Sequence, residues 1–124
     1  MHLVNLFNKI TNLYPNNTAL RYGTETQTYG ELNKSSNALV TLLCQNNIQS
    51  GDRVGLFFKD PLFFINAMLA LVKLNAIYVP FDNKDSFENI SNLCQVADVT
   101  FFLHDLDFID PLLLKQLGQS QKFY

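Results

Sequence analysis

Tryptophan is absent from this chain of 124 residues, and glycine, histidine, cysteine and charged residues are all scarce. Two cysteines are too few for a disulfide framework and show no metal-binding spacing, which excludes a disulfide-stabilised scaffold and a zinc module. We interpret Cys44 and Cys94 as half-buried free thiols in a reducing compartment.

Positive charge is also limited. Nine Lys and Arg residues stand against eleven Asp and Glu residues, the net charge is −2, and no basic run occurs. Nucleic acids and anionic membranes are therefore not expected as partners. The N-terminus lacks the basic region, apolar run and cleavage site of a signal peptide. The stretch Leu62–Leu74 is shorter than the ~20 residues that a membrane-spanning helix needs. We therefore expect no membrane association and a cytoplasmic location.

The sequence lacks the patterns that bind phosphate or hold a metal. Its closest glycines, Gly51 and Gly55, lie before and inside a predicted strand, and no Gly-Lys-Ser/Thr follows them. A P-loop and a dinucleotide fingerprint are therefore excluded. His2 and His104 fall near a terminus and in a predicted polar loop, without further metal ligands at suitable spacing.

Three aspartates lie close together in the sequence and could imitate an acidic pocket. We interpret them as two residues of a solvated loop and one helix cap, in the order Asp105, Asp107 and Asp110. No serine or cysteine lies in a nucleophile elbow. The residues thus predict no catalytic, cofactor-binding or metal site in this chain.

Phenylalanine, in contrast, is abundant. Eleven residues are Phe, apolar residues make up 48% of the chain, and charged residues make up 16%. A chain with this composition has more apolar surface than it can cover alone, which indicates a missing neighbour.

The stretch Pro61–Asp82 organises the rest of the chain. Asp60 can cap a helix and Pro61 suits its first position. The helix that follows is apolar on nearly all sides, with Asn66 and Lys73 as exceptions, and such a helix is expected to be buried all round. Asn75 is a plausible left-handed stop, and 76–79 is predicted to be a short buried strand.

The residues before this stretch predict a helix, a hairpin and a second helix. The first helix has one apolar face, made by Leu3, Leu6, Phe7, Ile10 and Leu13. The hairpin pairs 19–22 with 26–29 around Gly23. Thr28 and Glu31 form a capping box that opens the second helix. Its buried face is made by Leu32, Ser36, Leu39, Val40 and Leu43.

Two further strands, at 54–58 and 99–103, flank the central stretch. A helix capped by Asp85 or Ser86 precedes the latter strand, with apolar positions Phe87, Ile90, Leu93, Cys94 and Ala97. Asp110 and a proline begin a last helix at 112–117, and the tail 118–124 is expected to fray. The class is α/β: a partly parallel sheet with helical crossovers, preceded by a helix and a small hairpin, in one domain over 1–124.

Several short motifs occur in order along residues 3–103. They include Thr28-Tyr29-Gly30-Glu31-Leu32, the turn Gly51-Asp52-Arg53-Val54, and the stretch Val72–Asp82. In this order they resemble the adenylation domains of nonribosomal peptide synthetases, which belong to the adenylate-forming superfamily with acyl-CoA synthetases. Leu74 and Asn75 replace the Ala-Gly of the family's core motif, although Asn75 can still end the helix.

The resemblance implies that the chain is part of a larger adenylate-forming domain. In that family the glycine-rich phosphate loop, the pocket residues and the catalytic lysine come later, so ATP and Mg²⁺ are implied for the complete domain and no cofactor for this chain. The matching residues are expected to be structural, and they are Thr28, Tyr29, Glu31, Leu32, Gly51, Asp52, Lys73, Tyr78, Pro80 and Asp82.

The implied function is a truncated or split N-terminal segment of an ATP-dependent ligase that activates amino acids or acyl groups, inactive alone. Its partners would be a complementary C-terminal adenylation-domain chain or a carrier-protein system. The alternative is a non-catalytic docking module that pairs with a complementary chain or with itself. A third reading, an independent flavodoxin-like module, would need a ligand at its switch point, and no residue set for one is present.

Overall fold

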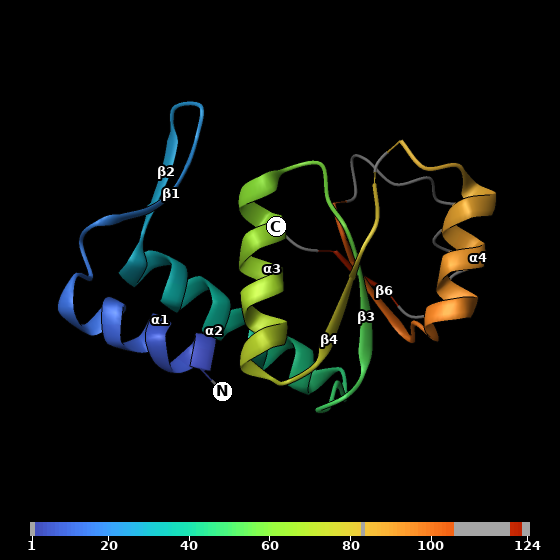
Figure 1. Cartoon of the computed structure of the whole chain (residues 1–124), viewed down its shortest axis with the longest axis horizontal. Helices are drawn as coiled ribbons and strands as arrows, with labels where there is room; N and C mark the ends of the chain where they lie inside the picture. The colour runs from blue at the N-terminus through green and yellow to red at the C-terminus, as the bar shows by residue number, and fades with distance from the viewer. Residues whose placement is uncertain (1, 83, 106–119, 123–124) are drawn as a thin grey trace.

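The computed structural model describes residues 2–82, 84–105 and 120–122. It is an α/β structure in which helices cover both faces of a central sheet (Figure 1). In chain order the elements are α1 (His2–Leu13), β1 (Thr18–Tyr22), β2 (Glu25–Thr28), α2 (Tyr29–Gln45), β3 (Arg53–Phe57), α3 (Pro61–Lys73), β4 (Ile77–Pro80), α4 (Phe87–Ala97), β5 (Phe101–His104) and β6 (Ser120–Lys122).

The central sheet has four strands in the order β4-β3-β5-β6. β3 pairs in parallel with both β4 and β5, and β6 pairs in parallel with β5. α3 connects β3 to β4, and α4 connects β4 to β5, as parallel pairing requires. The predicted fold class is confirmed. β6 differs from the predicted frayed tail, because its three residues pair with β5.

The part before the sheet forms as the local patterns indicate. β1 and β2 make an antiparallel hairpin whose turn contains Gly23 at φ +61°. The hairpin stands apart from the sheet, on the side of α1 and α2 (Figure 1). The predicted capping box is present: the Glu31 N–H donates to the Thr28 hydroxyl, and the Thr28 N–H donates to the Glu31 carboxylate.

Side chains alternate between the two faces of the sheet, as the pleat of a strand requires. One face and the helices α2 and α3 form what we call the aliphatic core, although it includes one phenylalanine. Its buried members are Leu39, Leu43, Ile48, Val54, Leu56, Ala67, Ala70, Leu71, Phe101 and Leu103. The other face and α4 form the phenylalanine core. Its buried members are Phe57, Phe81, Ile90 and Phe102.

The central stretch is only partly as predicted. Asp60 caps α3 by accepting from the Leu62 N–H, and Pro61 occupies the first turn. Asn75 ends the helix at φ +59°, as predicted. The prediction of a buried strand is wrong, because β4 lies at the sheet edge and leaves Ile77 45% and Tyr78 38% exposed.

The edge position of β4 agrees with the presence of a proline in this strand. The N–H groups of Ile77 and Phe81 donate to the carbonyls of Asp52 and Leu56, on the β3 side of the strand. Because successive residues of a strand direct their N–H groups to opposite sides, the backbone nitrogen of Pro80 faces the open edge. Pro80 has no N–H to offer there, and proline within a sheet is confined to edge positions of this kind.

Helix α1 also differs from expectation. Of its predicted apolar face, Leu3, Leu6 and Leu13 are 52%, 56% and 61% exposed, and Phe7 and Ile10 are half-buried. On α4, Leu93 is likewise exposed. The predicted last helix at 112–117 lies outside the described residues. No helix in the described ranges is long and apolar enough to span a bilayer.

Candidate functional site

Lys73 is the centre of a polar cluster between α3, α2 and α1. Its Nζ donates to Asn33 Oδ1 at 2.9 Å, Ser36 Oγ at 2.8 Å and Asn37 Oδ1 at 2.8 Å. The same nitrogen lies 5.2 Å from the centre of the Phe7 ring, in cation–π geometry. We call these five residues the lysine cluster.

The electrostatics of the lysine cluster favour a structural role. All three hydrogen-bond acceptors of Nζ are neutral oxygens, and burial lowers the pKa of Lys73 from its usual value. The ammonium has three hydrogens, and each has an acceptor, so no lone pair is presented for nucleophilic or base chemistry. The charge instead connects residues of two helices about forty positions apart in the sequence.

A second polar cluster joins the hairpin to the same two helices. Asn66, on α3, is 3% exposed. Its amide nitrogen donates to Gln27 Oε1 at 2.9 Å and to the Leu62 carbonyl at 2.7 Å, and its amide oxygen accepts from Gln27 Nε2 and Ser35 Oγ. All four hydrogen-bonding positions of a buried amide are therefore filled, as burial of a polar group demands. We call Gln27, Ser35 and Asn66 the amide cluster.

The motif residues at the start of α2 support these clusters. The Glu31 carboxylate accepts from the Thr28 backbone N–H, and this bond lowers the pKa of Glu31. The centres of the Tyr29 and Phe7 rings are 6.3 Å apart, and Leu32 lies on the buried side of α2. The capping box thus sets the position at which α2 begins, and with it the direction of Asn33 and Ser36.

The motif residues before β3 form a turn that meets the end of α3. Gly51 has φ +87°, a conformation that favours glycine, and its N–H donates to the Asn75 carbonyl at 2.9 Å. The Asp52 carboxylate accepts from the Gln49 N–H at 2.7 Å. Asp52 therefore closes the turn with its side chain, as the sequence indicated for it.

The remaining motif residues lie on or after β4, at the exposed edge of the sheet. Asp82 accepts from the Lys84 N–H at 2.9 Å, and its own N–H donates to the Asp85 carboxylate at 3.2 Å, so both its side chain and its backbone take part in a turn. Tyr78 and Pro80 are exposed. The ten motif residues are thus distributed over four places in the fold and do not converge on one cavity.

Burial departs from the sequence expectation at two further positions, His104 and Cys44, and agrees with it at Cys94. His104, predicted to lie in a polar loop, is 2% exposed at the end of β5, because the ladder pairs it with Phe57. Cys44 is exposed, not half-buried. Cys94 is half-buried as predicted, and burial raises the pKa of its thiol to about 11. Asp107 and Asp110 lie outside the described residues.

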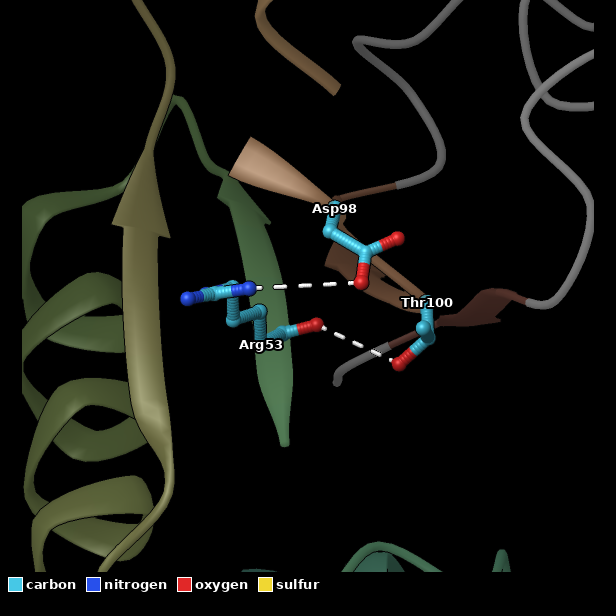
Figure 2. A network of polar contacts seen from close by, with 3 residues as sticks. All are labelled: Arg53, Asp98 and Thr100. Carbon is cyan, nitrogen blue, oxygen red and sulfur yellow. Dashed lines mark hydrogen bonds and ion pairs between the residues drawn. The ribbon is translucent and has the colours of Figure 1, made fainter. Parts of the chain in front are cut away.

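The sheet and α4 are also linked by a small polar network around Arg53 (Figure 2). Arg53 Nη1 lies 3.9 Å from Asp98 Oδ2, and the Thr100 hydroxyl donates to the Arg53 carbonyl at 3.4 Å. Asp98 ends α4 in the left-handed conformation, at φ +55°. This exposed network connects the end of α4 to β3 and contains no reactive arrangement.

The clusters found here were only partly visible in the sequence. In the sequence, Lys73 matches a family motif and Asn66 is an exception in an apolar run, but neither pattern identifies the partners of these residues. The signal that could have found them is the coincidence of polar residues on the buried sides of α2 and α3. In the described part of the chain, no group of three His, Cys, Asp or Glu side chains could hold a metal ion.

Comparisons with known proteins find matches to this chain in both sequence and structure. The sequence pattern of the AMP-binding enzyme family matches residues 7–122. Nonribosomal peptide synthetase sidE of Aspergillus fumigatus is 32% identical over an alignment of length 125, which covers 93% of this chain and 6% of the synthetase.

Two solved structures share the fold. O-succinylbenzoate coenzyme A synthetase (MenE) of Bacillus subtilis, solved with AMP, aligns with a TM-score of 0.86 and 20% identity over 94% of this chain and 30% of its own. MenE has also been solved with ATP and a magnesium ion. The N-terminal subdomain of Klebsiella oxytoca NpsA aligns with a TM-score of 0.83 and 23% identity over 95% of this chain and 30% of its own. NpsA has also been solved as an artificially fused adenylation–PCP di-domain with ThdA.

Proposed function

The chain belongs to the AMP-binding enzyme family, and we propose that it is an N-terminal segment of the adenylate-forming domain of an ATP-dependent ligase that activates an amino acid or another carboxylic acid. The observation that carries this proposal is the family match over residues 7–122, on a fold that MenE and NpsA share over most of the chain. The reaction of the complete domain would join the carboxylate to ATP and release pyrophosphate. ATP and Mg²⁺ would bind the complete domain, whose location we propose to be cytoplasmic.

The second part of the proposal is that the chain does not catalyse this reaction alone. This part is supported by the order of motifs in the family: the phosphate loop and the catalytic lysine come after the segment that this chain matches. The lysine that this chain does place in a polar cluster, Lys73, has its three ammonium hydrogens occupied by protein oxygens. We accordingly assign the ten motif residues structural roles.

Pyrophosphate release tests both parts. The purified chain is incubated with ATP, Mg²⁺ and a panel of amino acids and aryl acids, alone and with a polypeptide from a neighbouring reading frame that carries the phosphate loop. We expect no acid-dependent pyrophosphate from the chain alone, and release from the mixture. Acid-dependent release by the chain alone would refute the inactivity, and a folded mixture without release would count against the ligase.

A matched pair of variants tests whether Lys73 acts through assembly. Lys73→Met removes the ammonium from the lysine cluster, whereas Lys34→Met removes one from the exposed side of α2. If Lys73 only positions α1, α2 and α3, the first variant should lower the activity of the mixture by weakening association, and excess chain should restore it. A loss that persists at saturating chain would instead indicate a direct part in the reaction.

The second candidate function is a docking module without catalysis, which pairs with a complementary chain, a carrier-protein system or itself. It is favoured by the large apolar side chains that the described surface leaves exposed. Those on helices and the sheet edge are Leu3, Leu6, Leu13, Ile77, Tyr78, Leu93 and Val96. Binding without any turnover in the mixture described above would support docking over the ligase.

A further inference from the structure

Helix α1 gains little from burial in its own chain. Leu3, Leu6 and Leu13 are 52%, 56% and 61% exposed, and the other apolar side chains of residues 3–13 are half-buried. Within the same range the buried residue is Thr11, at 7% exposed. Because most of the stability of a helix in a protein comes from packing its apolar side, α1 is held weakly compared with α2 and α3.

The buried residue of α1 also favours release of the helix. The Thr11 hydroxyl has no hydrogen-bond partner among the described residues. A buried hydroxyl of this kind has lost its hydrogen bonds to water without replacing them, which raises the free energy of the docked state. When α1 leaves its place, the hydroxyl recovers those bonds.

The junction between α1 and the end of α3 is loosely packed. An open hollow of about 570 Å³ is lined there by Val4 and Asn5 of α1 and by Val72, Lys73 and Asn75. Side chains that border an open hollow lack contact atoms on one side and so contribute less dispersion energy. The first half of α1 is therefore not interlocked with α3.

The contacts that hold α1 in place centre on Phe7. The Lys73 ammonium lies 5.2 Å from the centre of its ring, and the Tyr29 ring lies 6.3 Å from it. Three oxygens of α2 fix the lysine nitrogen by hydrogen bonds, so the cation is positioned by elements other than α1. The attachment of α1 thus depends on one ring at a preformed cationic position.

Helix α1 is also a weak helix when it stands alone. It has 12 residues, with no acidic residue in its first turn and no basic residue in its last turn to complement the helix dipole. Isolated helices of this length are marginal in water. Detachment of α1 and loss of its helical hydrogen bonds should therefore occur together.

We propose that α1 is a detachable helix, which the contact between Phe7 and the Lys73 ammonium holds in its docked state and which melts when that contact opens. Detachment uncovers the lysine nitrogen and the hollow beside it. Order–disorder change of a single segment is one of the recurrent forms of conformational switch in proteins. The proposal concerns this chain by itself, so it holds or fails independently of the ligase and docking functions.

Hydrogen exchange followed by mass spectrometry tests the detachment. After correction for intrinsic rates, we expect the amides of α1 to exchange at least about tenfold faster than those of α3, because local opening needs far less free energy than opening of a core helix. Exchange of α1 as slow as that of α3 would overturn the proposal.

A pair of threonine variants tests the cause. Thr11→Val removes the buried hydroxyl and keeps the shape of the side chain, so α1 should exchange severalfold more slowly than in the unaltered chain. Thr41→Val is the matched control: it removes an exposed hydroxyl of α2 that donates to the Asn37 carbonyl, and should leave the exchange of α1 unchanged. Fraying of the chain end alone would not respond to Thr11→Val in this direction, and unchanged or faster exchange would reject the proposal.

Labelling of lysines tests whether α1 covers Lys73. Phe7→Leu removes the ring from the ammonium, and should make both the exchange of α1 and the acetylation of Lys73 by acetic anhydride severalfold faster. Lys34, exposed on α2, is the internal control in the same chain, and unchanged exchange of α3 would show that the variant is folded. A ratio of Lys73 to Lys34 labelling that Phe7→Leu leaves unchanged would overturn the proposal.

Discussion

The face of the sheet under α2 and α3 is sealed by mainly aliphatic side chains from two helices, whereas the face under α4 is lined by phenylalanine rings and has one described helix on it. The aliphatic core is one continuous cluster of side chains from α2, α3 and the strands that they cover. The phenylalanine core has fewer members, and α4 leaves Leu93 46% and Val96 86% exposed.

The two faces also differ in the polar contacts that join their helices. The helices of the aliphatic core are also joined by the lysine and amide clusters, which reach α1 and the hairpin. No comparable polar cluster fastens α4 within the described residues, where its polar link to the sheet is the exposed Arg53–Asp98 pair. The side that bears α4 is the one on which we expect added chain or partner surface to matter most.

The largest effects should come from cavities in the aliphatic core. Leu43→Ala removes a side chain that is 0% exposed between two helices and the sheet, and should lower the free energy of unfolding by about 3–5 kcal/mol. Ile90→Ala, in the phenylalanine core, should cost about 2–3 kcal/mol, because α4 can move to fill the space. Urea unfolding followed by circular dichroism measures both, and equal losses would contradict the difference between the faces.

A smaller effect is expected from overfilling the phenylalanine core. A Cβ on Gly55 would lie 2.5 Å from Phe102 Cε1 and 2.9 Å from Phe81 Cε2. Gly55→Ala should therefore destabilise the chain by about 1–3 kcal/mol. Adding Phe102→Leu should recover part of this loss, since it removes the ring edge. Additive losses in the double variant would show that the clash is not the cause.

Loss of the Lys73 charge should have a moderate effect, confined to the side of α2 and α3. Lys73→Met leaves Asn33, Ser36 and Asn37 without their shared donor, and should cost about 1–2 kcal/mol. Faster proteolysis near α1 would accompany it, because the contact with Phe7 is lost. Lys34→Met, at an exposed position on the same helix as Asn33, should change neither quantity.

The same variant tests the direction of the pKa shift. Burial lowers the pKa of Lys73 in the folded chain below its usual value of 10.5. The unfolded chain thus binds more protons between these two pKa values, and this lysine's contribution to stability increases as pH rises through that window. The stability difference between the unaltered chain and Lys73→Met should change accordingly in alkaline buffer, and a pH-independent difference would contradict the shift.

The smallest effect should come from the ion pair beside α4. Arg53 and Asp98 have side chains that are 47% and 83% exposed, and their charged atoms are 3.9 Å apart (Figure 2). Arg53→Gln should change the unfolding free energy by less than about 0.5 kcal/mol, since solvent screens such pairs. The Thr100 hydrogen bond persists because it uses the backbone of Arg53. A decrease in the unfolding free energy of more than about 1 kcal/mol would instead show that this ion pair holds α4 against the sheet.

Elements whose cause is local could be predicted from the sequence. The capping box of Thr28 and Glu31, the Asp60 cap and the Asn75 stop depend on residues within one turn of each other, and all three are confirmed. The parallel sheet could also be predicted, because helices of suitable length alternate with apolar strands. The partners of Lys73 could not, since Asn33 is forty positions away and no local pattern pairs them.

The sequence by itself determined the order of the elements from α1 to β5, the caps of the helices and which family's motifs the chain carries, because caps, turns and periodicity act between neighbouring residues. Only the tertiary structure decided which side of each element is buried. It placed β4 at an edge, His104 inside the sheet and the leucines of α1 outside. Burial is a property of the assembled surface: Phe7 contacts the distant Lys73, whereas Leu3, Leu6 and Leu13 on the same helix are exposed.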